Sequence, residues 1–299
     1  MDFVQIIQDG DDIVLDGIRH FDLAQTLDCG QAFRWNGTDK QFAGIAHGRY
    51  LHVEKINDGV VLKNMTLFDF EQIWKPYFDL TRNYAELREY FNFCPHLTNA
   101  MQFSPGLRLM RQDPWEMLIS FILSQNSNIP RIKKMINVLC QLYGEKLSCD
   151  TDNHTGAELS TLPVYGTGTY TFPTPTALAN ITESDLSPVK SGYRAAYIID
   201  AARRVVDGRF NIAELSIKPT EEVKHALLEI HGVGPKVADC VLLFGFGRVE
   251  CFPLDVWMKK VMTNMYPSGL PNEIKDYAGI AQQFLFHYAR TNKAAFAEL

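Results

Sequence analysis

The 299-residue sequence lacks paired cysteines, long apolar runs and an excess of basic charge, and each absence excludes a class of protein. Its six cysteines are scattered and form no CxxC pair, so we expect reduced, mostly buried thiols and neither a zinc site nor an iron–sulfur cluster. No apolar run reaches the roughly 20 residues that span a bilayer, so no membrane-spanning helix is expected. Internal repeats and low-complexity tracts are also missing, and nearly half of the residues are hydrophobic, as in a globular protein.

The net charge of −6 argues at first against a nucleic-acid partner, but its distribution weakens that argument. Residues 1–105 hold 9 Lys+Arg against 15 Asp+Glu, whereas residues 106–299 hold 20 of each. In this neutral part the basic residues form three clusters that could face phosphates: Arg131/Lys133/Lys134, Arg203/Arg204 and Lys259/Lys260. Each cluster could equally be an ordinary solvated helix face.

Short apolar runs separated by glycine turns dominate the first third of the chain. The runs lie at 13–15, 33–35, 42–45, 50–53 and 60–63, and between them stand Asn36-Gly37, His47-Gly48 and Asp58-Gly59. Asn-Gly and Asp-Gly between apolar runs indicate tight hairpins. The pattern therefore predicts an antiparallel sheet, with a helix over 67–78 packed on it.

Helical spacing replaces this pattern after Thr81. The run Pro114-Trp-Glu-Met-Leu-Ile-Ser-Phe-Ile-Leu-Ser is apolar nearly all round and predicts a buried central helix. A segment rich in Thr, Gly and Pro at 147–176 indicates a long loop. Further helices are expected at 84–91, 128–143, 176–179, 194–207, 220–230 with Thr220 as N-cap, 235–246, 255–266 and 272–291. The chain is thus predicted to be α+β, with a sheet domain at 1–105 and an all-α domain at 106–299.

A glycine hairpin is the most informative local motif. In Ile230-His-Gly-Val-Gly-Pro235 two glycines allow a tight turn, and the backbone N–H groups at the start of the following helix favour an anion. A phosphate would fit there without any basic side chain. Gly-x-Gly alone is weak evidence, because an ordinary helix–turn–helix with a glycine C-cap has the same pattern.

A lysine and a carboxylate follow this hairpin. Lys236 lies in the first turn of the next helix, where a cation is disfavoured and the neutral amine needed by a nucleophile is favoured. Asp255, in Phe252-Pro-Leu-Asp255, precedes a helical run and so predicts an N-cap. A capping aspartate can also point into a cleft and stabilise positive charge on a sugar. Hairpin, lysine and carboxylate together predict chemistry on DNA.

The sequence Leu228-Glu-Ile-His-Gly-Val-Gly-Pro-Lys-Val-Ala-Asp-Cys240 with Phe252-Pro-Leu-Asp255 resembles the 8-oxoguanine branch of the helix-hairpin-helix DNA glycosylase superfamily. The resemblance covers most of the chain, because four more family-like blocks follow the expected order: Asp28-Cys-Gly-Gln-Ala-Phe-Arg-Trp35, Phe121-Ile-Leu-Ser-Gln-Asn-Ser-Asn-Ile-Pro-Arg131, Gly192-Tyr-Arg-Ala195 and Tyr277-Ala-Gly-Ile-Ala-Gln-Gln-Phe-Leu-Phe286. It implies a TBP-like sheet domain, a helix-hairpin-helix at about 220–246, and a bifunctional DNA glycosylase and apurinic-site lyase of base-excision repair.

The resemblance also implies roles for particular residues. Lys236 would attack C1′ of a flipped 8-oxoguanine nucleotide and form a Schiff base that leads to β-elimination, and Asp255 would stabilise the transition state. The carbonyl of Gly30 would accept the N7–H that guanine lacks. Cys240 and Phe286 would sandwich the base, and Gln282 would read its Watson–Crick edge.

The implied partner is duplex DNA carrying 8-oxoguanine opposite cytosine. Two groups of residues would hold it: Asn126, Arg131, Tyr193 and Arg194 at the vacated stack and the opposite cytosine, and His231, Gly232, Val233 and Gly234 at a phosphate. We expect a monomer without cofactor, although the hairpin leaves room for a structural monovalent or divalent cation. The N-terminal twelve residues are acidic where a secretion or transit signal is basic, so a cytoplasmic, bacterial location with the nucleoid is expected.

Three departures from the family pattern limit what can be transferred. Ser127 stands within a run that is often three asparagines, Trp257 stands where some members have a histidine, and His231 stands where a proline is common. The resemblance therefore implies no DNA contact for Ser127 or Trp257.

Two alternatives remain at this point. The first is a superfamily member acting on alkylated or mismatched bases. The alkyl-base enzymes need no lysine at position 236. Thymine-glycol and mismatch enzymes usually carry a four-cysteine cluster after the catalytic helix, and that cluster cannot form here because Cys251 is the last cysteine. The second is a non-catalytic helix-hairpin-helix DNA-binding module. That module would explain the glycine hairpin but not Lys236 paired with Asp255.

Overall fold

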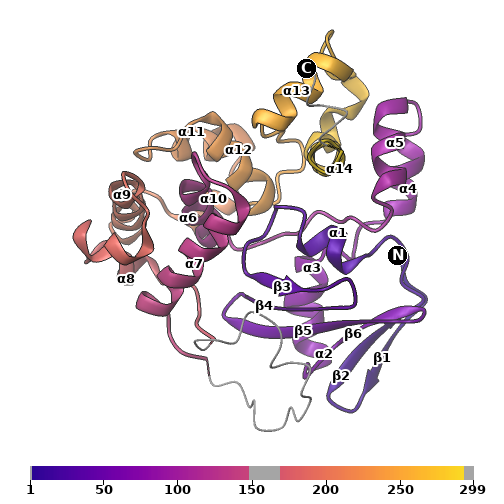
Figure 1. Cartoon of the computed structure of the whole chain (residues 1–299), viewed down its shortest axis with the longest axis horizontal. Helices are drawn as coiled ribbons and strands as arrows, with labels where there is room; N and C mark the ends of the chain where they lie inside the picture. Colours follow the sequence, from indigo (N-terminus) through magenta and orange to yellow (C-terminus); the bar gives the residue numbers. More distant parts are fainter. Residues whose placement is uncertain (1, 148–168, 293–299) are drawn as a thin grey trace.

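The computed structural model describes residues 2–147 and 169–292. An antiparallel sheet occupies one side of the molecule, and helices cover its upper edge and extend away from it (Figure 1). This confirms the predicted α+β architecture. The loop prediction for 147–176 and the thiol of Cys149 fall largely or wholly outside the described residues.

Six strands form the sheet in the order β1-β2-β6-β5-β4-β3: β1 (Gln5–Asp9), β2 (Asp12–Asp16), β3 (Trp35–Gly37), β4 (Gln41–Ala46), β5 (Arg49–Ile56) and β6 (Gly59–Leu62). The expected turn at His47-Gly48 joins β4 to β5. The turn expected at Asp58-Gly59 joins β5 to β6 but lies at Asn57-Asp58, because Gly59 already pairs within β6. The turn expected at Asn36-Gly37 is wrong, because both residues pair within β3 and the chain reverses at 38–40. Strand β1 was not expected; it is an edge strand with mostly exposed side chains, so no alternation marks it.

One helical segment covers a face of this sheet, as expected for 67–78. It consists of α2 (Leu67–Asp69), a π-helical turn (Phe70–Trp74) and α3 (Lys75–Tyr77). Its aromatic side chains pack with apolar strand residues into one core, and Trp35 Nε1 donates to the hydroxyl of Tyr77 at 2.7 Å. The sheet domain thus gains a closed aromatic core that fixes the loop leading into β3.

Helix α6 (Pro114–Ser124) lies within the helical core, and its residues 115–123 are all buried. This confirms the predicted central helix. The others are α1 (Leu23–Leu27), α4 (Tyr84–Tyr90), α5 (Pro95–Phe103), α7 (Ile129–Tyr143), α8 (Pro175–Ala179), η4 (Ser184–Val189), α9 (Arg194–Val206), α10 (Ile212–Ser216), α11 (Thr220–Leu228), α12 (Pro235–Phe244), α13 (Val256–Met265), η5 (Asn272–Tyr277) and α14 (Ala278–Thr291).

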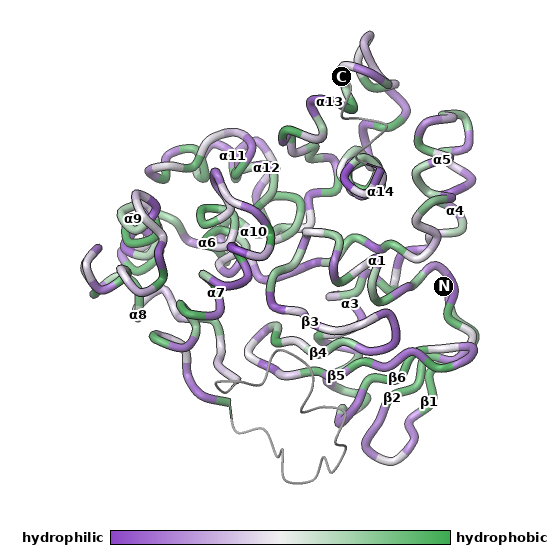
Figure 2. The backbone as a smooth tube through the Cα atoms, in the orientation of Figure 1, coloured by the Kyte–Doolittle hydropathy of each residue, from purple (hydrophilic) through white to green (hydrophobic). Residues whose placement is uncertain are grey.

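Apolar stretches meet where α6 and α12 pack together, whereas the turn between β1 and β2 is hydrophilic (Figure 2). Helices α4 and α5 precede residue 106, the boundary expected between the domains, yet their buried side chains belong to the helical core. Conversely, Met110 belongs to the core of the sheet. Among residues 2–147 and 169–292, no helix combines the length and apolarity that a bilayer crossing requires.

Capping residues set several helix starts. Asp255 and Asn128 accept hydrogen bonds from the third residues of α13 and α7, at 2.8 and 3.0 Å, as N-caps do. The expectation for Thr220 is wrong: Pro219 is the N-cap of α11, and the Thr220 hydroxyl instead contacts Glu250. The five described cysteines are free and buried, as expected.

A buried ion pair joins the loop before β3 to the first turn of α6. Arg34 Nη1 lies 3.4 Å from Glu116 Oε2, both side chains are about nine-tenths buried, and Arg34 also donates to the carbonyl of Tyr170. Burial raises the pKa of Glu116 to about 7, and the Arg34 guanidinium opposes that rise. Charging Glu116 therefore costs folding free energy as the pH rises from the usual carboxyl range through 7.

We expect Arg34→Met to make stability more dependent on pH. Without its counter-ion, Glu116 should titrate still higher, so the variant should lose about 1–2 kcal/mol more than the wild type between pH 5 and pH 8. Urea unfolding at the two pH values measures this loss. The double variant Arg34→Met/Glu116→Gln is the control and should lack the extra slope, whereas parallel pH curves for wild type and Arg34→Met would refute the assignment.

Candidate active site

The hairpin between α11 and α12 is held in a fixed shape by glycine and by local hydrogen bonds. Gly232 has φ +82°, and a Cβ there would lie 2.2 Å from the ring of Tyr197. The Val233 N–H donates to the Ile230 carbonyl at 3.0 Å, whereas the N–H of Gly234 has no acceptor within the described residues. This N–H lies at the start of α12, where the helix dipole favours an anion, so the geometry fits a phosphate.

Helix α12 places Lys236 and Cys240 on one face, because they are four residues apart. Lys236 is the second residue of the helix, as expected, and its Nζ lies 5.0 Å from the ring centre of Phe121. Burial raises the pKa of Cys240 to about 11, and Lys236 opposes that rise. Cys240 is therefore a neutral, apolar wall beside the amine.

Asp255 also acts electrostatically on this thiol. Its carboxylate caps α13 and also raises the pKa of Cys240, so Lys236 and Asp255 both act electrostatically on one atom. Burial raises the pKa of Asp255 itself, opposed by the backbone N–H of Met258 and by Lys236. Amine and carboxylate are thus close enough to act on each other electrostatically.

The loop carrying Gly30 comes from the sheet domain and is anchored on both sides. Gln31 is fully buried, donates to the carbonyls of Thr26 (2.9 Å) and Arg108 (2.7 Å), and accepts from the Met110 N–H. Cys29 accepts a hydrogen bond from Gln283 of α14 at 3.1 Å. Gly30 has φ +94°, a conformation that other residues rarely adopt.

Helix α14 brings Gln282 and Phe286 to this loop. The position of a Cβ on Gly30 would lie 3.3 Å from Phe286, so the sheet domain and the last helix meet at that point. Gln282 is buried and donates through Nε2 to the carbonyl of Pro253 at 3.4 Å, two residues before Asp255. Its Oε1 is buried without a partner in the described chain, which is costly unless a ligand donates to it.

The residues expected at the vacated DNA stack and the opposite cytosine differ in how exposed they are. Asn126 adopts the left-handed conformation (φ +47°) and donates to the Tyr193 hydroxyl at 3.1 Å, and Tyr193 is half exposed. Arg131 is exposed. Arg194 is buried instead, and its guanidinium donates to the carbonyls of Gln125, Asn126 and Ser191. In this structure Arg194 therefore fixes the Asn126 turn.

Two of the three basic clusters are partly used within the protein. Lys133 pairs with Asp28 at 3.0 Å, Arg204 pairs with Asp200 at 2.8 Å, and Arg203 donates to the carbonyl of Ala179. The third cluster lies on α13, where Lys260 Nζ is 5.9 Å from the ring centre of Trp257.

Sequence reasoning missed Arg290. It follows Gln282 and Phe286 at the same four-residue spacing, and its Nη1 lies 3.4 Å from the Cβ position of Gly30. Extending the helical spacing of α14 by one step would have identified it.

Two family models match the chain consecutively. Residues 14–118 match the 8-oxoguanine DNA glycosylase N-terminal domain, and residues 119–278 match the HhH-GPD superfamily of base excision DNA repair proteins. The second match alone covers more than half of the sequence.

Individual relatives agree with these matches. A Clostridium acetobutylicum 8-oxoguanine glycosylase/lyase, solved with double-stranded DNA containing cytosine opposite 8-oxoG, is 35% identical with a TM-score of 0.87, covering 98% of this chain and 100% of that one. A probable N-glycosylase/DNA lyase of Methanothermobacter thermautotrophicus is 29% identical over 90% of this chain and 94% of its own length. An N-glycosylase/DNA lyase of Arabidopsis thaliana is 28% identical over 89% of this chain and 73% of its own. The chain therefore belongs to the 8-oxoguanine DNA glycosylase/lyase family, bifunctional N-glycosylase/DNA lyases of the HhH-GPD base excision repair superfamily.

Proposed function

We propose that this protein excises 8-oxoguanine from duplex DNA through a lysine Schiff base and then cleaves the strand by β-elimination. The observation that carries the proposal is the placement of Lys236 in the first turn of α12, directly after the hairpin, with its Nζ 5.0 Å from the ring centre of Phe121 and with Cys240 on the same helix face. Gln282, whose Nε2 donates to the Pro253 carbonyl, adds an Oε1 that has no partner in the described part of the chain. The DNA in the structure of the Clostridium relative supports the same substrate class.

The proposed chemistry begins with the neutral amine of Lys236 attacking C1′ of the deoxyribose. The bond between C1′ and the base nitrogen breaks, its electron pair leaves with the base, and the base takes up a proton. Opening of the sugar ring then gives an imine between C1′ and Nζ. Loss of a proton from C2′ expels the 3′ phosphate, and water hydrolyses the imine to restore the lysine. Asp255 stabilises the positive charge that develops on the sugar.

Base selection follows from groups on three separate segments. The carbonyl of Gly30 would accept the N7–H of 8-oxoguanine, whereas guanine would present a lone pair to a buried acceptor. Gln282 Oε1, which has no partner among the described residues, would accept from the Watson–Crick edge. Cys240 and Phe286 would form the two walls, because a neutral thiol and a ring can both contact a planar base.

The proposal is tested by base release and borohydride trapping on duplexes that carry 8-oxoguanine, guanine or an alkylated purine. We expect release and a covalent adduct with 8-oxoguanine only. Release of the alkylated purine without release of 8-oxoguanine would favour the alternative glycosylase class, and tight binding without any release would favour a DNA-binding module.

Preference for opposite cytosine is a separate prediction that depends on Arg131. Its guanidinium is exposed, and arginine donors match the acceptors of cytosine. We expect Arg131→Ala to lower the preference for cytosine over adenine by roughly tenfold, since a good bidentate contact discriminates by about 1–3 kcal/mol. Single-turnover rates with 8-oxoguanine opposite each base measure this ratio.

Lys134→Ala is the matched control, because Lys134 is exposed on the same helix. It should weaken binding without changing the ratio. Equal wild-type activity opposite all four bases would refute the preference, and an unchanged ratio in Arg131→Ala would remove Arg131 from it.

A further inference from the structure

Helix α9 and its N-cap contact both segments that are proposed to hold DNA: the turn after α6 and the hairpin between α11 and α12. Tyr193, Tyr197 and Asp200 are spaced by four and three residues, so they lie on one side of α9. The sequence did not indicate these contacts, because the family-like block at the start of α9 ends at Ala195.

At one end, α9 fixes the turn that contains Asn126. Tyr193 accepts the amide of Asn126 at 3.1 Å, and Arg194 donates to the Gln125 carbonyl at 2.8 Å. The Arg194 guanidinium also lies 4.8 Å from the ring centre of Tyr193. A left-handed asparagine is strained unless its surroundings hold it, and these contacts do so.

At the other end, α9 fixes the hairpin. The Tyr197 ring lies edge-to-face with His231 at 4.7 Å and with Tyr193 at 5.6 Å. It also fills the space that a Cβ on Gly232 would need. Asp200 accepts the His231 N–H at 3.0 Å while it pairs with Arg204.

A direct hydrogen bond also joins the turn after α6 to the hairpin. Gln125 Nε2 donates to the carbonyl of Gly232 at 3.1 Å. The turn, α9 and the hairpin therefore form a ring of contacts in which the Tyr197 side chain is the central packed group.

We propose that Tyr197 is a positioning residue that sets the separation between the gap-filling turn and the phosphate-binding hairpin. The inference rests on the proposed function, since both segments would hold the same duplex. Lys236 follows the hairpin by two residues, so a shift of the hairpin relative to the turn moves Nζ relative to C1′. A misplacement of about 1 Å can cost on the order of 100-fold in rate.

The test compares Tyr197→Ala with Tyr197→Phe in the full chain. We expect Tyr197→Ala to lower the saturating single-turnover rate on 8-oxoguanine duplex by about 10- to 100-fold. Its affinity for a duplex with a tetrahydrofuran abasic analogue should stay within about threefold, because the hairpin N–H groups still meet a phosphate. Tyr197→Phe should restore the rate, because the Tyr197 hydroxyl makes no hydrogen bond within residues 2–147 and 169–292.

A second readout does not depend on excision. 2-Aminopurine placed opposite the abasic analogue should brighten when the wild type fills the gap, and Tyr197→Ala should reduce that signal by roughly half or more. Val206→Ala, at the exposed end of α9, is the control and should change neither readout. A wild type that brightens the probe but releases no 8-oxoguanine would refute the proposed function without affecting the linkage.

Two results would overturn the positioning role. The first is a Tyr197→Ala variant that melts at a lower temperature yet keeps the wild-type saturating rate and fluorescence when assayed well below its melting point. The second is a Tyr197→Phe variant as defective as Tyr197→Ala, which would assign the effect to the hydroxyl.

Discussion

Replacement of Lys236 by glutamine is expected to abolish the borohydride-trapped adduct with 8-oxoguanine duplex and to slow base release on the order of 10⁴-fold. Glutamine is similar in length to lysine and is tolerated in the first turn of a helix, so α12 should keep its place. Its amide nitrogen is not nucleophilic and cannot form an imine with C1′. The amine beside Cys240 and 5.0 Å from the Phe121 ring centre is thus expected to be the group that the reaction requires.

Gel analysis of trapped complexes and single-turnover base release measure this effect, with DNA affinity as the companion measurement. Lys218→Gln is the control, because Lys218 is an exposed lysine in a loose ion pair with Glu222 (3.8 Å) at the start of α11. That variant should trap normally. Base release by Lys236→Gln at the wild-type rate would refute the lysine mechanism, whereas loss of release with retained duplex binding would support it.

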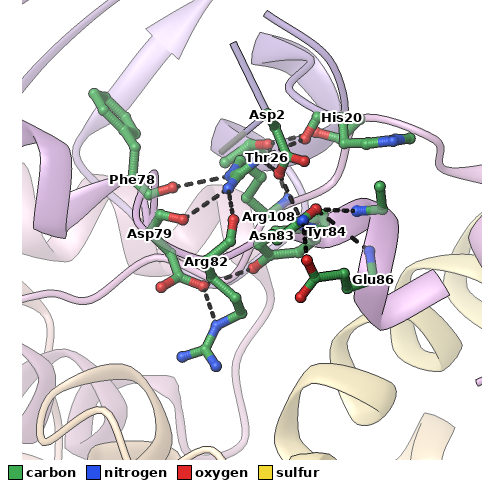
Figure 3. A network of polar contacts seen from close by, with 12 residues as sticks. Asp2, His20, Thr26, Phe78, Asp79, Arg82, Asn83, Tyr84, Glu86 and Arg108 are labelled. Carbon is green, nitrogen blue, oxygen red and sulfur yellow. Dashed lines mark hydrogen bonds and ion pairs between the residues drawn. The ribbon is translucent and has the colours of Figure 1, made fainter. Parts of the chain in front are cut away.

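Replacement of Arg108 by methionine is expected to produce the largest loss of stability, about 3–5 kcal/mol. Arg108 is completely buried, and its Nη1 lies 2.9 Å from Asp2 Oδ2, which is buried as well (Figure 3). The guanidinium also donates to four backbone carbonyls, those of His20, Phe78, Asp79 and Arg82. Methionine would leave these four acceptors without the guanidinium donors and the buried Asp2 carboxylate without its counter-ion, with the Tyr84 N–H still donating to Asp2 at 2.8 Å.

The loss should appear as a fall in the urea midpoint and in Tm by roughly 10 °C. Lys cannot substitute fully, because three ammonium donors cannot satisfy five acceptors in this arrangement. The double variant Arg108→Met/Asp2→Asn should recover part of the loss, since it removes the unpaired buried charge. A cost below about 1 kcal/mol for Arg108→Met would show that the network contributes little net stability.

Local chemistry determined much of the fold from the sequence alone. Four of the five runs lie in strands because alternating apolar residues and two glycine turns specify hairpins without distant contacts. The helix starts at Asn128 and Asp255 follow from side chains that cap their own helices. The errors share one cause: Asn36-Gly37 and Thr220 satisfy local rules, but pairing with β4 and the approach of Glu250 give them other partners.

The sequence by itself also determined the reactive end of the site. Lys236, its hairpin and Asp255 lie within 26 residues of Ile230, so helix geometry alone places amine and phosphate-binding N–H groups together. The family blocks added Gly30, Gln282 and Phe286 as separate positions. They did not show that these positions meet.

Only the tertiary structure decided how the distant segments converge. The contact between Gly30 and Phe286 joins the first and last quarters of the chain, and the buried Gln31 and Cys29 set its geometry through Arg108 and Gln283. The sequence likewise predicted Arg194 as a DNA contact, yet its side chain is buried against the carbonyls of a turn about 70 residues earlier. Such contacts depend on packing between elements far apart in the chain, and no local periodicity records which elements will pack together.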